Sequence, residues 1–210
     1  GFWNIIQGLN KAGRKPKIVV IENVFGALTS RQGQDFELIA NAVAKEGYII
    51  GAMVIDAVYF VPQSRPRLFI IGVDSSLAMP LEIHAATPHP AWHPAALIRA
   101  HNRLSPQGKA SWRWWCMPVS TDPAPRLDDL MEADPVGVQW HTQEETQKVL
   151  NMMSPLHRRK VMAAQGLGRA KVGMIYKRTR NGTQRAEVRF DGIAGCLRTP
   201  SGGSSRQTVM

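Results

Sequence analysis

Residues 18–21 are four consecutive β-branched apolar side chains, Ile-Val-Val-Ile, and Lys17 stands directly before them. A short run that is apolar at every position is typical of a buried strand in a parallel sheet, because both faces of such a strand are covered. Apolar residues recur at helical spacing before it, over 2–9, and after it, over 35–46. The chain therefore begins in the α-β-α order of an α/β domain.

Two further strand patterns follow, over 48–55 and over 68–73. Only about a dozen residues separate them, Pro62 and Pro66 among them, and a parallel crossover normally needs a helix of its own. We therefore expect these two strands to be antiparallel. An α-β-α-β-β order with an antiparallel last strand describes half of a doubly wound sheet.

Positive charge is concentrated late in the chain. The net charge is +10, yet residues 1–98 carry eight basic side chains against seven acidic ones. Residues 154–190 carry ten basic side chains and a single acidic one, Glu187. Such an excess indicates a polyanionic partner. The sequence thus predicts a near-neutral part joined to a strongly basic part.

Asn181-Gly182 lies between two strand-like runs and is a strong signal for a two-residue hairpin turn. The turn would pair Arg178 with Arg185. It would also gather one aromatic and four basic side chains on one face: Tyr176, Arg178, Arg180, Arg185 and Arg189. Opposed arginines repel each other, and a phosphate or a base edge between them would relieve the repulsion. A plain solvated ribbon with excess arginine is the alternative.

Several other clusters allow a structural or a functional interpretation. Residues 80–125 show no clean period, so we expect irregular structure there. The tryptophans of 112–115 could stack on bases, although a small core in the basic part is the simpler expectation. The serines and the arginine of 201–206 could hold phosphates or belong to a plain loop. Three histidines and a cysteine match no familiar zinc spacing, so no metal site is expected: His84, His89, His93 and Cys116.

Composition excludes some protein classes. Two cysteines without a CxxC motif exclude a disulfide-rich scaffold. No apolar run approaches the roughly 18–20 residues of a membrane span, and no signal peptide is visible, so a cytoplasmic protein is expected. The chain begins with glycine in a helical pattern and ends in a strand-like pattern, so both ends look like cuts through a larger fold.

Two motifs carry a family resemblance. Glu22-Asn23-Val24 follows the first apolar run, and Gln63, Arg65 and Arg67 follow some forty residues later. Alone, Glu22 would be a surface acid and the Pro/Arg stretch a weak motif. Together, in this order and spacing, they resemble the ENV and QxRxR signatures of the DNA cytosine-5 methyltransferase family. Residues 2–3 look like the tail of the preceding motif, and 191–203 resemble the glycine-rich end of the family's target recognition domain.

The resemblance implies a fold with two incomplete parts. Residues 1–75 would be the C-terminal half of a doubly wound, Rossmann-like sheet that depends on S-adenosylmethionine, with an antiparallel last strand. Residues 76–210 would be a mixed, irregular target recognition domain that binds double-stranded DNA. The complete enzyme is expected to be monomeric and to serve restriction-modification or phage DNA protection.

The resemblance also implies roles for single residues. Such an enzyme flips a cytosine out of the duplex, adds a cysteine thiolate to C6 and methylates C5 from S-adenosylmethionine. Glu22 matches the glutamate that holds N3 and the exocyclic amine. Arg67, with Arg65, matches the arginines that fix O2 and brace the catalytic loop, and Asn23 and Gln63 match supporting residues. The expected DNA contacts are the five hairpin residues together with Arg198, Thr199, Ser204 and Arg206.

Departures from the family pattern limit what this chain can do alone. It has no Pro-Cys pair to supply the nucleophile and no Phe-x-Gly-x-Gly loop to bind the cofactor. The closing motifs would begin after Met210, and Cys196-Leu197 stands where the family usually has Thr-Leu. The isolated chain is therefore expected to be inactive. A non-enzymatic DNA-binding module, or one subunit of a split methyltransferase, is the alternative.

Overall fold

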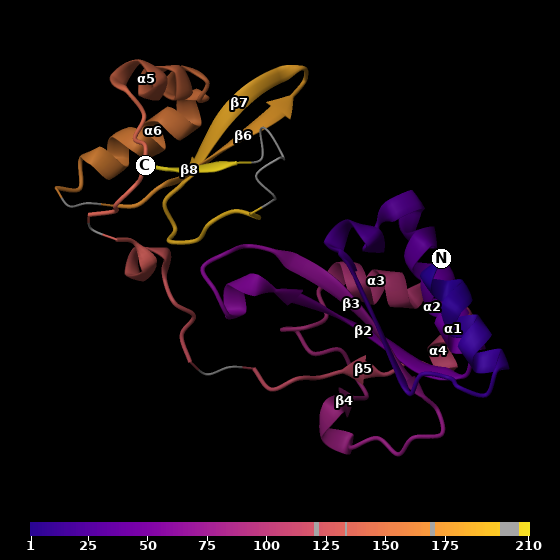
Figure 1. The fold of residues 1–210 in the computed structure, drawn as a ribbon. Helices are drawn as coiled ribbons and strands as arrows, with labels where there is room; N and C mark the ends of the chain where they lie inside the picture. Colours follow the sequence, from indigo (N-terminus) through magenta and orange to yellow (C-terminus); the bar gives the residue numbers. More distant parts are fainter. Residues whose placement is uncertain (120–121, 133, 169–170, 198–205) are drawn as a thin grey trace. The chain divides into compact units, whose positions relative to one another are not determined.

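The computed structural model describes residues 1–119, 122–132, 134–168, 171–197 and 206–210. Two compact units make up the chain, and Figure 1 draws both. The first unit is Gly1–Asp56 with Pro66–Thr121, and the second is Ala57–Arg65 with Asp122–Met210. This division differs from the boundary predicted between 75 and 76. Residues 76–119 pack on the first sheet, and the loop 57–65 is bonded within the second unit.

A three-stranded sheet forms the centre of the first unit. Its strands are β1 (Ile18–Val24), β2 (Tyr48–Asp56) and β3 (Pro66–Asp74), in the order β1-β3-β2. Strand β3 is antiparallel to both neighbours, which confirms the predicted antiparallel pairing of the last two strands. No strand among the described residues pairs with the outer edge of β1.

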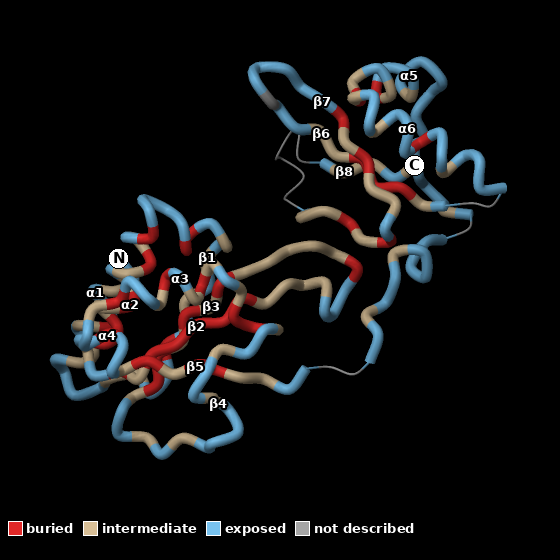
Figure 2. The backbone as a smooth tube through the Cα atoms, turned by 180° about the vertical axis from the view of Figure 1, so that it is seen from behind, coloured by how far each residue is buried: buried red, intermediate tan, exposed pale blue. Residues whose placement is uncertain are grey.

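Helices cover one face of this sheet (Figure 1). They are α1 (Phe2–Lys11), α2 (Gln34–Lys45), α3 (Ala95–Asn102) and the short α4 (Pro106–Ala110). The apolar stripe of α2 packs with side chains of α3 and of the strands, and Figure 2 shows the buried backbone along β2 and β3. Short 3-10 turns lie at Phe25–Leu28, Ser30–Gly33, Ala57–Tyr59, Leu81–Ile83 and Leu127–Leu130.

The opposite face of the sheet is covered by residues that were expected to be irregular or to belong to the basic part. Trp92 and Trp115 are buried there against Met53 and Val73, and β4 (His84–Ala85) pairs with β5 (Trp114–Trp115). The prediction of irregular structure over 80–125 was therefore wrong for the segments that form α3, α4, β4 and β5, whereas 86–94, 116–119 and 122–125 contain no helix or strand. The tryptophans do form a core, but it is the core of the first unit.

Backbone pairing along the outer edge of β2 explains this packing. The Ile50 N–H donates to the Ser111 carbonyl at 2.8 Å, and the Arg113 N–H donates to the Ile50 carbonyl at 2.7 Å. The indole N–H of Trp115 crosses the strand to the Ile71 carbonyl at 3.1 Å. Gly51 permits this approach, because a Cβ there would overlap the Arg113 carbonyl oxygen. Helical or strand periodicity cannot reveal such a lateral contact.

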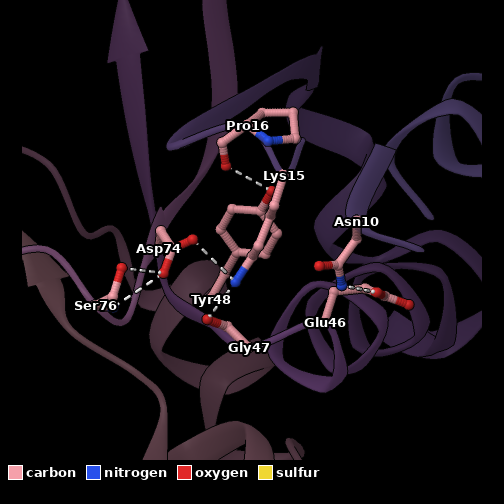
Figure 3. Close-up of polar contacts among 8 residues, drawn as sticks. All are labelled: Asn10, Lys15, Pro16, Glu46, Gly47, Tyr48, Asp74 and Ser76. Atoms are coloured by element: carbon pink, nitrogen blue, oxygen red, sulfur yellow. Dashed lines mark hydrogen bonds and ion pairs between the residues drawn. The ribbon is translucent and has the colours of Figure 1, made fainter. Parts of the chain in front are cut away.

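A polar network fastens one end of the first sheet (Figure 3). Lys15 Nζ donates to the Gly47 carbonyl at 2.9 Å, lies 3.3 Å from the Asp74 carboxylate, and stands over the Tyr48 ring. The Tyr48 hydroxyl donates to the Pro16 carbonyl at 2.8 Å. Hydrogen bonds from Ser76 hold the pKa of the Asp74 carboxyl below its usual value, and the Lys15 ammonium lowers it further by a smaller amount.

The second unit packs two helices on a small antiparallel sheet. The helices are α5 (Gln143–Asn151) and α6 (Pro155–Gln165). The sheet has the order β7-β6-β8, made of β6 (Met174–Arg180), β7 (Thr183–Arg189) and β8 (Gln207–Val209). Its core contains Val149, Met153, Val161, Ile175, Ala186 and Val188.

The β6–β7 hairpin has the predicted register. Arg178 pairs with Arg185, and Arg180 pairs with Thr183 across the two-residue turn. Both turn residues have positive φ, 50° at Asn181 and 74° at Gly182, as this hairpin type requires. In the described part of the chain, no helix has the length and apolar character needed to cross a membrane.

Candidate functional site

Glu22 and Arg67 form an ion pair at the carboxyl end of β1. Arg67 Nε lies 3.3 Å from Glu22 Oε1, and the two side chains are 17% and 57% exposed respectively. The arginine is also bound to the backbone, since its Nη1 donates to the Pro66 carbonyl at 2.9 Å. A largely enclosed guanidinium thus holds a carboxylate that remains accessible to a ligand.

Strand register produces this pair. Glu22 lies opposite Phe69 in the β1–β3 ladder, so Arg67, two residues from Phe69, points to the same face. Glu22 lies inside β1 rather than just past its end, because the strand continues to Val24. The two motifs, far apart in the sequence, therefore meet on adjacent strands.

Asn23 has a different orientation from Glu22, as alternation along a strand requires. Its side-chain oxygen accepts the Val24 N–H at 2.8 Å, so it shapes the end of the strand. A hollow of about 540 Å³ lies beside it, lined also by Ser30, Asp35 and Ile39.

Gln63 and Arg65 belong to the second unit and are bonded within it. Gln63 forms a parallel bridge with Ala194, and Arg65 Nη1 donates to the Leu197 carbonyl at 3.2 Å. The same Nη1 lies 3.2 Å from Cys196 Sγ. Motif spacing could not reveal these partners, because Arg65 lies in a loop and its direction does not follow strand alternation. Of the two motif arginines, the structure brings Arg67 to Glu22.

The β6–β7 hairpin carries exposed arginines near its turn. Arg178 and Arg185 are exposed and directly opposed, and Arg178 also lies 4.8 Å over the Tyr176 ring. Glu187 reduces the positive field locally, since its carboxylate is 3.9 Å from Arg178 Nε. Burial is the main cause that raises the pKa of the Tyr176 hydroxyl, and a hydrogen bond with Glu187 is the second. The hydroxyl is therefore neutral at physiological pH.

The remaining residues predicted to contact DNA differ in their surroundings. Arg189 is paired with Asp191 through two hydrogen bonds, and this pairing lowers the pKa of the Asp191 carboxyl. Arg206 is exposed beside β8. The backbone of Arg180 lies in β6. Three further predicted contacts lie outside the described residues: Arg198, Thr199 and Ser204.

The histidines of the first unit serve packing. His93 is 2% exposed and lies edge-on to Trp114, with ring centroids 4.9 Å apart. His101 packs between Trp112 and Trp114. Burial lowers the pKa of both imidazoles. Within the described ranges, no group of three potential ligands could hold a metal ion.

Comparison with known proteins gives a consistent match. A family model described as C-5 cytosine-specific DNA methylase matches residues 2–200. The orphan methyltransferase M.SPBetaI of Bacillus phage SPbeta is 38% identical over 65 residues, which is 30% of this chain and 15% of that protein. The type II methyltransferase M.BsuFI of Bacillus subtilis is 36% identical over 79 residues, or 37% of this chain and 19% of its own. M.Eco47II of Escherichia coli, also a type II methyltransferase, is 38% identical over 65 residues, or 30% and 16%. The chain thus matches less than a fifth of the length of these relatives.

Proposed function

Because the chain belongs to the C-5 cytosine-specific DNA methylase family, we propose that it supplies the base-holding and DNA-reading parts of a DNA cytosine-5 methyltransferase. The ion pair between Glu22 and Arg67 carries this proposal, since it brings the two family motifs together at one end of the sheet. The proposed substrate is a cytosine that is flipped out of double-stranded DNA.

Each member of the pair has a task that suits its environment. The exposed Glu22 carboxyl holds the cytosine by N3 and the exocyclic amine and moves a proton at N3. The enclosed Arg67 guanidinium fixes that carboxyl and donates to the cytosine O2. Arg65 braces the loop, while Asn23 and Gln63 support the backbone on either side.

The residues of this chain do not fit S-adenosylmethionine by themselves. A Cβ would meet the protein's own atoms at the crowded glycines of the first unit, so these glycines do not form a cradle for a ligand: Gly33, Gly51, Gly72 and Gly108. The sequence also lacks a Phe-x-Gly-x-Gly loop. We therefore propose that another polypeptide segment binds the methyl donor.

The sheet supports a partial doubly wound domain. The face of β1 that carries Glu22 also exposes apolar side chains, with Ile18 at 59% and Val20 at 54%. An open strand edge beside such side chains favours pairing with a further strand. We propose that the Rossmann-like, S-adenosylmethionine-dependent sheet of the complete enzyme continues from this edge.

Methyl transfer tests the proposal directly. The 210-residue chain incubated with S-adenosylmethionine and DNA should transfer no methyl group, because no Pro-Cys pair is present. Addition of a complementary polypeptide that carries the Pro-Cys and cofactor motifs should restore transfer. In that mixture Glu22→Gln should remove activity, whereas Glu37→Gln, a partly exposed acid on α2, should not. Full activity of Glu22→Gln would refute the assignment.

Salt-dependent DNA binding tests the hairpin. We propose that Arg178 and Arg185, with Tyr176 and Arg189 beside them, contact the DNA, and that Arg180, Arg198, Thr199, Ser204 and Arg206 extend this contact. Replacing Arg178 and Arg185 by alanine should reduce affinity and lower the slope of log K against log salt by about 1.8 if both contact phosphates. The control Arg14→Ala with Arg99→Ala removes the same charge from exposed positions of the first unit. Equal slopes in both variants would reject the hairpin as a DNA contact.

A split enzyme or a non-catalytic DNA-binding module is the second candidate, favoured by the absence of a Pro-Cys pair. Restored methyl transfer in the mixture described above supports the split form. DNA binding that persists while no complementary polypeptide restores activity supports the binding module.

A further inference from the structure

The loop that connects β2 to β3 is bonded to a segment far along the chain. The Ser64 N–H donates to the Ala194 carbonyl at 2.9 Å, and the Ala194 N–H donates to the Pro62 carbonyl at 2.7 Å. Ala194 is only 5% exposed, so these bonds are sheltered from water. We call residues 62–65 and 194–197 together the clasp.

Arg65 closes the clasp at its end. Its Nη1 donates to the Leu197 carbonyl and contacts Cys196 Sγ, both at 3.2 Å. A hydrogen bond from a charged guanidinium is stronger than one between neutral groups. Arg65 therefore adds a side-chain attachment to the backbone pairing of Pro62, Ser64 and Ala194.

Only Pro66 separates Arg65 from Arg67. The proline ring fixes one backbone dihedral angle, so this link has little freedom. Arg67 is bound to the same link, because its Nη1 donates to the Pro66 carbonyl at 2.9 Å. Arg65 and Arg67 are thus joined through a single residue, whose carbonyl is itself bonded to Arg67.

We infer that Arg65 is a positioning residue, which holds the loop on residues 194–197 and thereby sets Arg67 against Glu22. The importance of this positioning role for catalysis rests on the proposed function. The segment 194–197 lies in the stretch that resembles the end of a target recognition domain.

Amide hydrogen exchange on the 210-residue chain tests the attachment without DNA. Arg65→Ala should accelerate exchange of the Ser64 and Ala194 amides about tenfold, while the amides of α2 keep their protection. Cys196→Ala, which leaves the Leu197 carbonyl in place, should give a smaller acceleration. Arg14→Ala, at an exposed position, should give none. Unchanged exchange in Arg65→Ala overturns the inference.

The Nε–Hε nuclear magnetic resonance signal of Arg67 tests the positioning effect. Arg65→Ala should shift this signal, because Arg67 Nε faces Glu22, and Arg65→Lys should return it towards its original position. A signal that does not move while the clasp amides exchange faster refutes a positioning role. Neither experiment uses DNA, so a chain without DNA affinity would refute the proposed function and leave this test intact.

Discussion

Gly51→Ala should strongly destabilise the first unit. The added Cβ would overlap the Arg113 carbonyl oxygen and lie 2.5 Å from Trp115 Nε1. The carbonyl belongs to the backbone that pairs with β2, so no side-chain rotation relieves the overlap. The segment 111–115 must move away, which breaks the two backbone hydrogen bonds to Ile50.

The magnitude follows from these contacts. Overpacking costs about 1–3 kcal/mol, and each lost hydrogen bond costs about 1 kcal/mol. Replacing a strand glycine by alanine also stabilises the fold by roughly 0.5–1 kcal/mol, because it lowers the conformational entropy of the unfolded chain. We therefore expect a net loss of about 2–4 kcal/mol, a large share of the roughly 5–15 kcal/mol that stabilises a typical domain.

Urea unfolding followed by tryptophan fluorescence measures this loss. Of the six tryptophans, all but Trp140 belong to the first unit, so the signal reports mainly on that unit. Gly8→Ala is the matched control, because nothing lies within 4 Å of a Cβ there and α1 should gain up to about 1 kcal/mol. If Gly51→Ala unfolds within 0.5 kcal/mol of the original chain, the packing of 111–115 on β2 is refuted.

Three further perturbations have defined outcomes. Because burial lowers the pKa of His93 and His101, the unfolded chain binds more protons than the folded chain below about pH 6.5. The free energy of unfolding should therefore fall from pH 7 to pH 5. His101→Phe should make this fall smaller when the free energy is measured by urea unfolding at each pH. Lys15→Met should cost about 1 kcal/mol, measured by thermal unfolding, since it removes the hydrogen bond to Gly47 and the contact with the Tyr48 ring. Thr142→Ala should reduce the stability of α5 by about 1 kcal/mol, because the Thr142 side chain caps that helix; unaltered hydrogen exchange in α5 would contradict this.

Local patterns predicted much of the fold. The Asn181-Gly182 turn determined the hairpin register, because two residues with positive φ leave few ways to join the strands. The short distance between the second and third strand patterns determined their antiparallel pairing. Residues 80–119 were not predictable in this way, since their order comes from pairing with β2 and from contacts between tryptophans of distant segments.

The candidate site shows the same contrast. Family motifs identified Glu22 and Arg67. Their contact follows from the register of β1 against β3, which no local sequence pattern predicts. Arg65 and Arg67 stand two positions apart, and strand alternation would have sent both side chains to one face. The strand begins only at Pro66, so Arg65 is directed by loop bonds to Cys196 and Leu197 instead.

The network of Lys15, Tyr48 and Asp74 has a consequence for how the protein tolerates change. Its contacts, drawn in Figure 3, join the beginnings of β1 and β2 to the end of β3. Glu22 and Arg67 lie towards the other end of β1 and β3. The contacts that anchor the sheet and the residues proposed to carry the chemistry therefore lie at opposite ends of one sheet. Substitutions around the proposed base-holding pair could then alter what is bound while the anchored end keeps the strands in register.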